Sequence, residues 1–204
     1  MSLSVDSQVV ALLPGSRAGE VARMGRLFLD VARWCLQKKK DISFVMPAAS
    51  PAREKQLRDL LNDYPDVPVT LISGQSQWCM AASDAVLMAS GTTTLEAMLL
   101  KKPMIVAYKM ASISYAIISR LLKVPYVSLP NLLANEKLVP ELLQNDATVE
   151  NLGTALSAIL DDSRHVQLLK NRFAALHQDI KRNASDCAAK AILQLLDASS
   201  KTVS

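Results

Sequence analysis

The stretch VLMASGTTTLEAML, residues 86–99, joins two hydrophobic patterns without a linker between them. Its first residues are continuously apolar, which is typical of a strand buried on both faces of a sheet. Ser90-Gly91 and three threonines then interrupt the apolar run. A helical pattern follows at once, with one carboxylate, Glu96, about one turn into it. A strand that turns directly into a helix is the building unit of α/β proteins.

The same alternation continues in both directions along the chain. The apolar runs predict strands at 9–13, 42–46 (closed by Pro47), 67–72, 85–88 and 104–107, and a sixth at 126–129 that could also be only a loop. Apolar residues spaced three and four apart predict helices at 21–35, 51–63, 75–82, 92–100 and 111–122. From Pro140 onward only helical pattern is expected, with a stripe through Leu168, Leu169, Phe173, Leu176 and Ile180.

Strands of this kind, alternating with helices, predict a Rossmann-like α/β fold with a parallel sheet covered on both faces. We expect the Rossmann-like domain to span residues 9–160. Residues 161–204 are expected to form a helical carboxyl-terminal tail that packs on this domain or on a partner, and residues 1–8 a linker or an expression scar.

The charge of the chain favours small anionic ligands over nucleic acid. The 204 residues carry a net charge of +4, and the longest basic run is Lys38–Lys40. A nucleic-acid-binding surface usually gathers more positive charge than this. Mild basicity suits an anionic small molecule equally well.

Cysteine and histidine positions give no indication of a metal site or a cofactor. Cys35, Cys79 and Cys187 are far apart, which is typical of reduced, buried thiols in a cytosolic protein. His165 and His177 have no cysteine or carboxylate at ligand spacing. Nor does any apolar run approach the ~18 residues needed to span a bilayer.

Two turns that follow predicted strands have the composition of anion sites. In LLPGSRAGE, residues 12–20, Gly15 permits a tight turn and a close approach of the backbone to a ligand. The next helix presents free N–H groups and the positive end of its dipole there. Ser16 adds a hydroxyl and Arg17 a cation able to make two hydrogen bonds to one anion.

The second turn, Ser90-Gly91-Thr92, has the same strand-to-helix form. Because ligands of such sheets bind at the carboxyl ends of the strands, the two turns are expected to face one ligand. A diphosphate suits both turns, and Glu96 could then accept hydrogen bonds from the hydroxyls of a ribose.

Simpler explanations exist for each turn. Thr93 to Glu96 also fits a capping box, which needs no ligand, and Arg17 could be a solvated surface residue. Neither turn matches the dinucleotide or the P-loop pattern. Trp34 and Trp78 are expected on core faces of helices, and residues 110–122 fit a core helix or a membrane-surface helix.

Four blocks of the chain, in this order and spacing, resemble the carboxyl-terminal half of lipid-A-disaccharide synthase. They are LLPGSRAGE, ASGTTTLEAML, KKPMIVAYK and VPYVSLPNLLA, and the resemblance runs from about Val9 to the end. Enzymes of this family are metal-free, inverting GT-B glycosyltransferases of Gram-negative bacteria. They transfer 2,3-diacylglucosamine from UDP to 2,3-diacylglucosamine 1-phosphate and form the β-1,6-linked disaccharide of lipid A.

The resemblance implies a role for named residues. Gly15, Ser16 and Arg17 would meet the diphosphate of the donor UDP-2,3-diacylglucosamine from one side, and Ser90, Gly91, Thr92 and Thr93 from the other. Glu96 would hold the ribose, and the Ser73-Gly74-Gln75 turn would lie near the base. Tyr108 and Asn131 are also expected at the donor site.

The resemblance also implies what this chain lacks. The catalytic base and the lipid-acceptor site of the family lie in the half before the PGSR strand, so the chain is expected to bind UDP, to need no cofactor and to transfer nothing by itself. The full-length enzyme would be cytoplasmic and peripheral to the inner membrane, and its carboxyl-terminal helices could join two copies into a homodimer. The alternatives are a separate nucleotide-sugar-binding subunit of a two-part enzyme, a UDP-sugar epimerase, and a structural module without a ligand.

Overall fold

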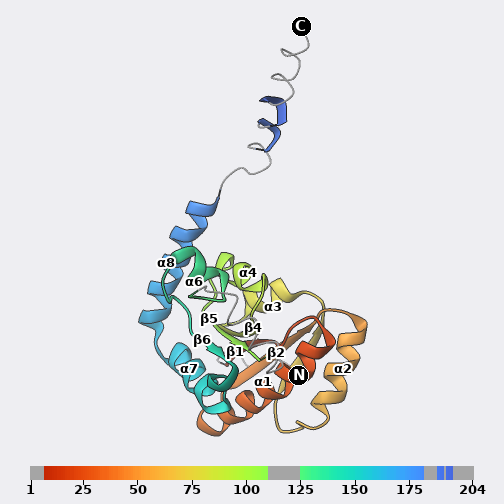
Figure 1. The fold of residues 1–204 in the computed structure, drawn as a ribbon. Helices are drawn as coiled ribbons and strands as arrows, with labels where there is room; N and C mark the ends of the chain where they lie inside the picture. Colours follow the sequence, from red (N-terminus) through yellow and green to blue (C-terminus); the bar gives the residue numbers. More distant parts are fainter. Residues whose placement is uncertain (1–6, 110–124, 182–187, 191, 195–204) are drawn as a thin grey trace.

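The structure of the chain is a computed structural model, which describes residues 7–109, 125–181, 188–190 and 192–194. Six parallel strands form one sheet in the order β3-β2-β1-β4-β5-β6 (Figure 1). The strands are β1 Gln8–Leu13, β2 Ile42–Ala48, β3 Val69–Ser73, β4 Ala85–Ala89, β5 Met104–Tyr108 and β6 Glu141–Leu143. The predicted Rossmann-like α/β fold is confirmed. Strand order reverses between β1 and β4, the place where such sheets bind ligands.

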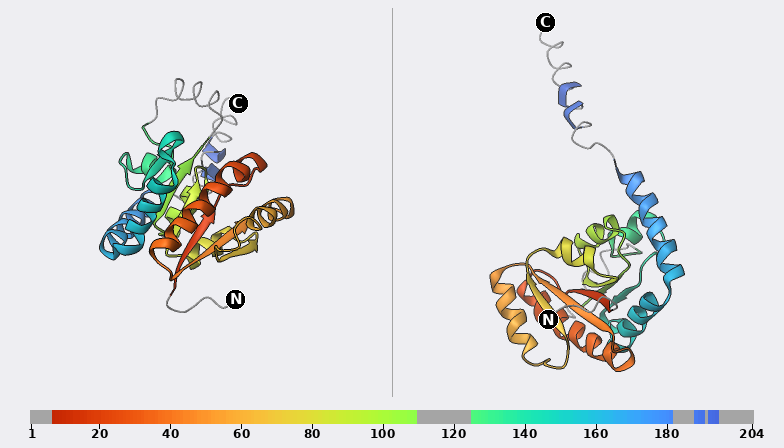
Figure 2. Two further views of the ribbon diagram at one scale, coloured as in Figure 1. Left: turned by 90° about the horizontal axis from the view of Figure 1, so that it is seen from below. Right: turned by 180° about the vertical axis from the view of Figure 1, so that it is seen from behind.

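Helices cover both faces of the sheet (Figures 1 and 2). Helices α1 Ala18–Lys38, α2 Pro51–Leu61 and α7 Val149–Asp161 pack on one face. Helices α3 Ser76–Ala82, α4 Thr93–Leu99 and α8 Ser163–Ile180 pack on the other. The short helix α6 Leu129–Ala134 contacts α4 and α8, and a 3-10 turn, η1 Gln144–Asp146, precedes α7.

Each face is built from alternate residues of the strands. In β1, Val10 and Leu12 pack under α1, whereas Ala11 and Leu13 face the α4 and α8 side. Successive side chains of a strand point to opposite faces, so a strand buried on both faces must be apolar throughout. The continuous apolar run that predicted β1 has this cause.

The first strand correction concerns Pro47, which was expected to close β2. The strand instead continues to Ala48, and Pro47 pairs in register with Ile72 of β3. The ladder between β2 and β1 has already ended at Val45. The carbonyl oxygen of Ala48 accepts from the Gly74 amide on the β3 side of the strand. Because neighbouring residues of a strand direct their backbone groups to opposite sides, the nitrogen of Pro47 faces the β1 side, where no ladder bond is needed.

The second correction concerns the sixth strand. Residues 126–128 form a bent stretch that leads into α6, so the strand predicted there is wrong. The sixth strand is β6, in a region where only helices were expected. β6 has three residues, begins with a charged side chain and is defined by its pairing with β5, so it leaves little pattern in the sequence. The helix predicted at 111–122 lies outside the described residues.

Two predictions about apolar side chains also change. Trp78 was expected in the core but is 74% exposed, because the short helix α3 buries only Cys79 and Met80. Trp34 packs against the core as expected. In the α8 stripe, Leu169, Phe173 and Leu176 are buried against the sheet, and only Leu168 is largely exposed. Of the two partners expected for this part of the tail, the stripe therefore packs on the Rossmann-like domain itself.

The tight packing of α1 against α7 gives a first test. A Cβ added at Gly153 of α7 would lie 2.3 Å from Cε3 of Trp34. Replacing a helical glycine by alanine usually stabilises by up to ~1 kcal/mol, but overpacking a core costs about 1–3 kcal/mol. Gly153→Ala should therefore lower the free energy of unfolding measured in urea. Gly19→Ala is the control, because its Cβ would meet nothing closer than 3.5 Å; equal effects of the two substitutions would contradict this packing.

The buried thiols give a second test. Burial raises the pKa of the Cys35 thiol to about 11, although a hydrogen bond with Ser157 lowers it, and burial also raises the pKa of Cys79. The thiolate is the reactive form, so both residues should resist iodoacetamide at pH 8. Peptide mapping by mass spectrometry should find them alkylated only after unfolding in urea. Rapid labelling of Cys35 in the folded chain would contradict its burial on the inner face of α1.

Candidate functional site

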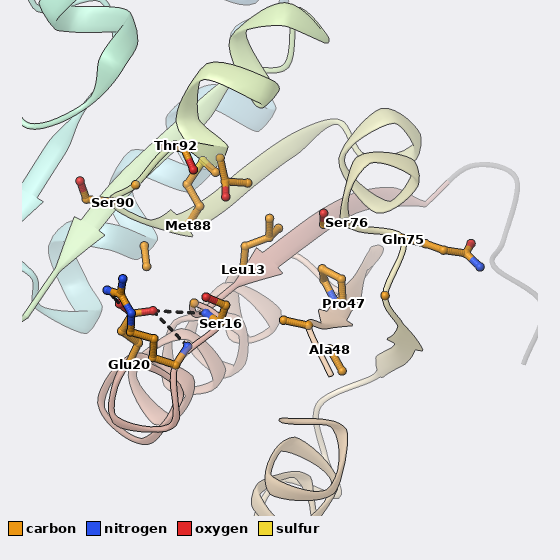
Figure 3. Close-up of a pocket in the computed structure, with 17 residues that line it drawn as sticks. Leu13, Ser16, Glu20, Pro47, Ala48, Gln75, Ser76, Met88, Ser90 and Thr92 are labelled. Atoms are coloured by element: carbon orange, nitrogen blue, oxygen red, sulfur yellow. Dashed lines mark hydrogen bonds and ion pairs between the residues drawn. The ribbon is translucent and has the colours of Figure 1, made fainter. Parts of the chain in front are cut away.

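A cavity of about 560 Å³ opens at the carboxyl end of the sheet, beside the reversal of strand order (Figure 3). Leu13 at the end of β1 and Met88 near the end of β4 lie side by side in the sheet, and both line the cavity. The turns that follow β1, β2, β3 and β4 supply the other lining residues. Cavities of this size commonly hold small molecules.

The first glycine turn lies on one side of the cavity. Gly15 has a φ of +115°, a conformation that residues with a Cβ rarely adopt. Helix α1 then starts at Ala18, and the Val21 amide donates to the Arg17 carbonyl 3.0 Å away. Ser16 and Arg17 line the cavity, with 83% of the Arg17 side chain exposed. The turn thus joins backbone N–H groups to a mobile cation, as an anion site requires.

Glu20, which was not predicted from the sequence, accepts hydrogen bonds from the N–H groups of this turn. Its Oε2 accepts from the amides of Ser16 and Arg17, at 3.2 and 3.3 Å, and its Oε1 lies 3.1 Å from Nη1 of Arg17. Figure 3 shows this carboxylate against the turn. The spacing of three residues from Arg17 to Glu20 was the available signal, since a carboxylate at the third helical position commonly reaches back to the turn before the helix.

The second turn lies opposite the first. Ser90, Gly91, Thr92 and Thr93 line the cavity, and the Ser90 hydroxyl donates to the Val127 carbonyl at 3.3 Å. Thr92 makes no side-chain capping bond to α4. Its hydroxyl and the amides of the turn are therefore candidate donors to an anion, whereas the Ser90 hydroxyl would have to leave the Val127 carbonyl to become one.

The capping box considered for Thr93 to Glu96 does not form in this arrangement. The residue before α4 is Thr92, and Glu96 accepts instead from Nε2 of Gln77 in α3, at 3.1 Å. Glu96 stands on the first turn of α4 but is not among the residues that line the cavity.

The third predicted turn is brought to the cavity only in part. Gly74 and Gln75 line it, and Gln75 adopts a left-handed conformation with φ 56°. The side chain of Gln75 points away from the other labelled residues in Figure 3. Ser73 is instead hydrogen-bonded to Glu54, and this bond, with the nearby Arg58, lowers the pKa of that carboxyl.

The structure therefore divides the predicted site residues into two groups. Nine line one cavity: Gly15, Ser16, Arg17, Gly74, Gln75, Ser90, Gly91, Thr92 and Thr93. Four do not: Ser73, Glu96, Tyr108 and Asn131. Tyr108 ends β5 and is partly buried.

Asn131 is fully buried, and its amide is saturated by bonds within the protein. Its Oδ1 accepts from the amides of Leu138 and Val139, at 2.8 and 2.9 Å, and its Nδ2 donates to the Val139 carbonyl and to Glu141. Glu141 in turn accepts from the amides of Val127 and Ser128. Asn131 is thus placed to hold the segment that contacts Ser90.

Within the described residues, no group of three His, Cys, Asp or Glu side chains is close enough to hold a metal ion. In the same part of the chain, no helix is both long and apolar enough to cross a membrane.

Comparison with known proteins gives a consistent result. A family model described as lipid-A-disaccharide synthetase matches residues 1–192. The chain is 50% identical over 198 residues to the lipid-A-disaccharide synthase of Hahella chejuensis, covering 97% of this chain and 50% of the relative. It is 52% identical over 196 residues to that of Pseudomonas syringae pv. tomato, covering 96% and 50%. The chain thus spans about half the length of these curated relatives.

Solved structures share the fold at low identity. WaaG, a glycosyltransferase involved in lipopolysaccharide biosynthesis, matches with a TM-score of 0.54 at 15% identity over 93% of this chain and 47% of its own. The UDP-GlcNAc 2-epimerase from Neisseria meningitidis, bound to UDP-GlcNAc, matches with a TM-score of 0.58 at 18% identity over 94% and 46%. These matches agree with a GT-B type of Rossmann-like domain.

The network around Asn131 can be tested by stability. Asn131→Ala leaves the amides of Leu138 and Val139 without their acceptor. Each buried amide without a partner costs about 1–3 kcal/mol, so a loss of roughly 2–6 kcal/mol is expected in urea unfolding. Asn171→Ala, on the exposed face of α8, is the control. A loss no larger than that of the control would show that Asn131 does not hold this segment.

Proposed function

The chain belongs to the lipid-A-disaccharide synthase family, and we propose that it is the donor-binding half of such a glycosyltransferase. The enzyme would move 2,3-diacylglucosamine from UDP to 2,3-diacylglucosamine 1-phosphate with inversion. The observation that carries the proposal is the pair of glycine turns after β1 and β4, which face each other across one cavity.

The proposed diphosphate site lies between these turns. The amides of Ser16 and Arg17 and the start of α1 would donate from one side. The Thr92 hydroxyl would donate from the other, joined by the Ser90 hydroxyl once it exchanges its bond to the Val127 carbonyl for the ligand. Arg17 is well suited to a phosphate because its guanidinium can make two parallel hydrogen bonds. Its side chain is 83% exposed, and to reach the ligand it would exchange its contact with Glu20.

The nucleoside would extend from this site along α3 and α4. Glu96 is the proposed ribose ligand, and to act so it would exchange its bond to Gln77 for the ribose hydroxyls. The Ser73–Gln75 turn is proposed to lie near the base, with Gly74 and Gln75 at the edge of the cavity. Tyr108 and Asn131 stay proposed residues of the donor site, although, like Ser73 and Glu96, they do not line the cavity. The buried Asn131 would act through the segment that contacts Ser90.

The transfer needs a stabilised leaving group and an activated acceptor hydroxyl. Arg17 and the amino-terminal end of α1 would stabilise the negative charge that develops on the departing UDP. Among the described lining residues, Glu20 is the one carboxylate, and it is bound to the turn and to Arg17. The base that activates the acceptor is therefore proposed to come from outside this chain, and the chain alone would bind UDP without transfer.

The remaining partners follow from the same proposal. The lipid acceptor would bind through the other half, and the acylated substrates would hold the whole enzyme at the cytoplasmic surface of the inner membrane. Association of two copies through the carboxyl-terminal helices stays a prediction; within the described part of α8, the exposed Leu168 is the apolar residue open to it.

A calorimetric titration with UDP tests the proposal. Binding is expected in EDTA and to persist unchanged in magnesium. Arg17→Ala and Glu96→Ala should each weaken it about 10- to 150-fold, the equivalent of the roughly 1.5–3 kcal/mol of a hydrogen bond to a charged group.

Arg26→Ala serves as the matched control, because this arginine also lies on α1 but pairs with Asp63 outside the cavity. Equal binding by all four proteins, or none by the wild type at millimolar UDP, would contradict the proposal.

A further inference from the structure

We propose that Glu20 is an internal competitor for the donor's diphosphate: its carboxylate takes the proposed phosphate-binding donors of the turn after β1 and turns away when the nucleotide binds. This inference rests on the proposed function, because it concerns the same turn. Glu20 would set the affinity for the nucleotide and the rate of its release, and would take no part in the reaction.

The contacts of Glu20 are those a phosphate would make. One carboxylate oxygen receives two neighbouring backbone N–H groups, and the other lies beside the Arg17 guanidinium. A phosphate at the start of a helix uses the same kinds of donor. Two anions cannot share these donors, so a diphosphate that binds here must displace the carboxylate.

The position of Gly15 supports this competition. A Cβ on Gly15 would lie 2.6 Å from Oε2 of Glu20 and 2.7 Å from its Cβ. The glutamate therefore occupies the space that the glycine leaves open above the turn. If Glu20 turned away, the same space would admit a ligand oxygen to the backbone.

The bonds that hold Glu20 are easily exchanged. Its two contacts to amides, 3.2 and 3.3 Å, are longer than the ~2.9–3.0 Å that is most common for N–H···O hydrogen bonds. In its ion pair with Arg17, the arginine side chain is 83% exposed and the Glu20 side chain 16% exposed, so water can replace Glu20 as the partner of Arg17. Glu20 also caps α1, because it is the third residue of the helix and accepts from the amide of Arg17, the residue before the helix. A phosphate that displaces it would take over these amides, and the first bond of the helix, from the Val21 amide to the Arg17 carbonyl, does not involve Glu20.

Competition of this kind has a consequence for turnover. The free energy of donor binding is reduced by the contacts that Glu20 gives up, and those contacts re-form when UDP leaves. Glu20 would thereby speed release of the UDP product and would discriminate against ligands too weakly charged to displace it.

The test measures binding of pyrophosphate, followed by calorimetry and by the ¹⁵N amide signals of Ser16 and Arg17. Glu20→Gln keeps the shape of the side chain and removes its charge, and Glu20→Ala removes both. Each variant should bind pyrophosphate about tenfold more tightly than the wild type, as expected from removing one competing unit charge. Asp161→Asn is the control, because it removes the charge of one exposed carboxylate at the end of α7, which pairs with Lys39.

The outcomes separate this inference from the proposed function. Unchanged or weaker pyrophosphate binding in both Glu20 variants, with the chain folded by circular dichroism, would show that Glu20 only caps the helix and would overturn the inference. A second titration uses UDP. If UDP binds and depends on Arg17 but the Glu20 variants do not bind pyrophosphate more tightly, the inference fails alone. If those variants bind pyrophosphate more tightly and no protein binds UDP, the proposed function fails alone.

Discussion

The parallel pairing of β1 with β4 is the constraint on which the site depends. Four residues of each strand are in register, from Val10 with Ala85 to Leu13 with Met88, so the two strands end at the same edge. The turns that follow must then face each other, although they are separated by more than seventy residues of chain. Because β2 lies on the other side of β1, the helices that leave these two turns go to opposite faces of the sheet. The cavity between the turns is a product of this topology.

Packing and buried polar bonds fix the second turn further. Glu141, at the start of β6, accepts from the amides of Val127 and Ser128, and Asn131 bonds to the same carboxylate. The Val127 carbonyl then accepts from Ser90 at the edge of the cavity. The hydrogen bonds of the buried Asn131 amide and the Glu141 carboxylate favour a single conformation of this loop. Any conformation that broke one of these bonds would leave a polar group in the interior without its partner. A residue outside the cavity can in this way position a residue inside it.

Periodicity predicted five of the six strands and the main helices because those elements bury one or both faces, and burial leaves a pattern in the sequence. It failed where burial does not decide the structure. Three-residue β6 exists through its bonds to β5, and α3 is too short to bury Trp78.

The glycine turns were found because their residue types are unusual after a strand. Glu20 was missed because its role depends on the backbone conformation of Gly15, the residue against which its side chain packs. Asn131 carried no local signal of its bonds, since they reach residues seven to ten positions away.

A crystal structure of the chain with UDP, grown in EDTA, would test the central claim most directly. The account predicts the diphosphate between the Ser16–Arg17 amides and the Ser90–Thr92 turn, with Arg17 folded onto it, Glu20 turned out of the turn and the ribose at Glu96. UDP bound at another part of the surface, or a diphosphate that touches one turn only while Glu20 keeps its contacts, would contradict the account.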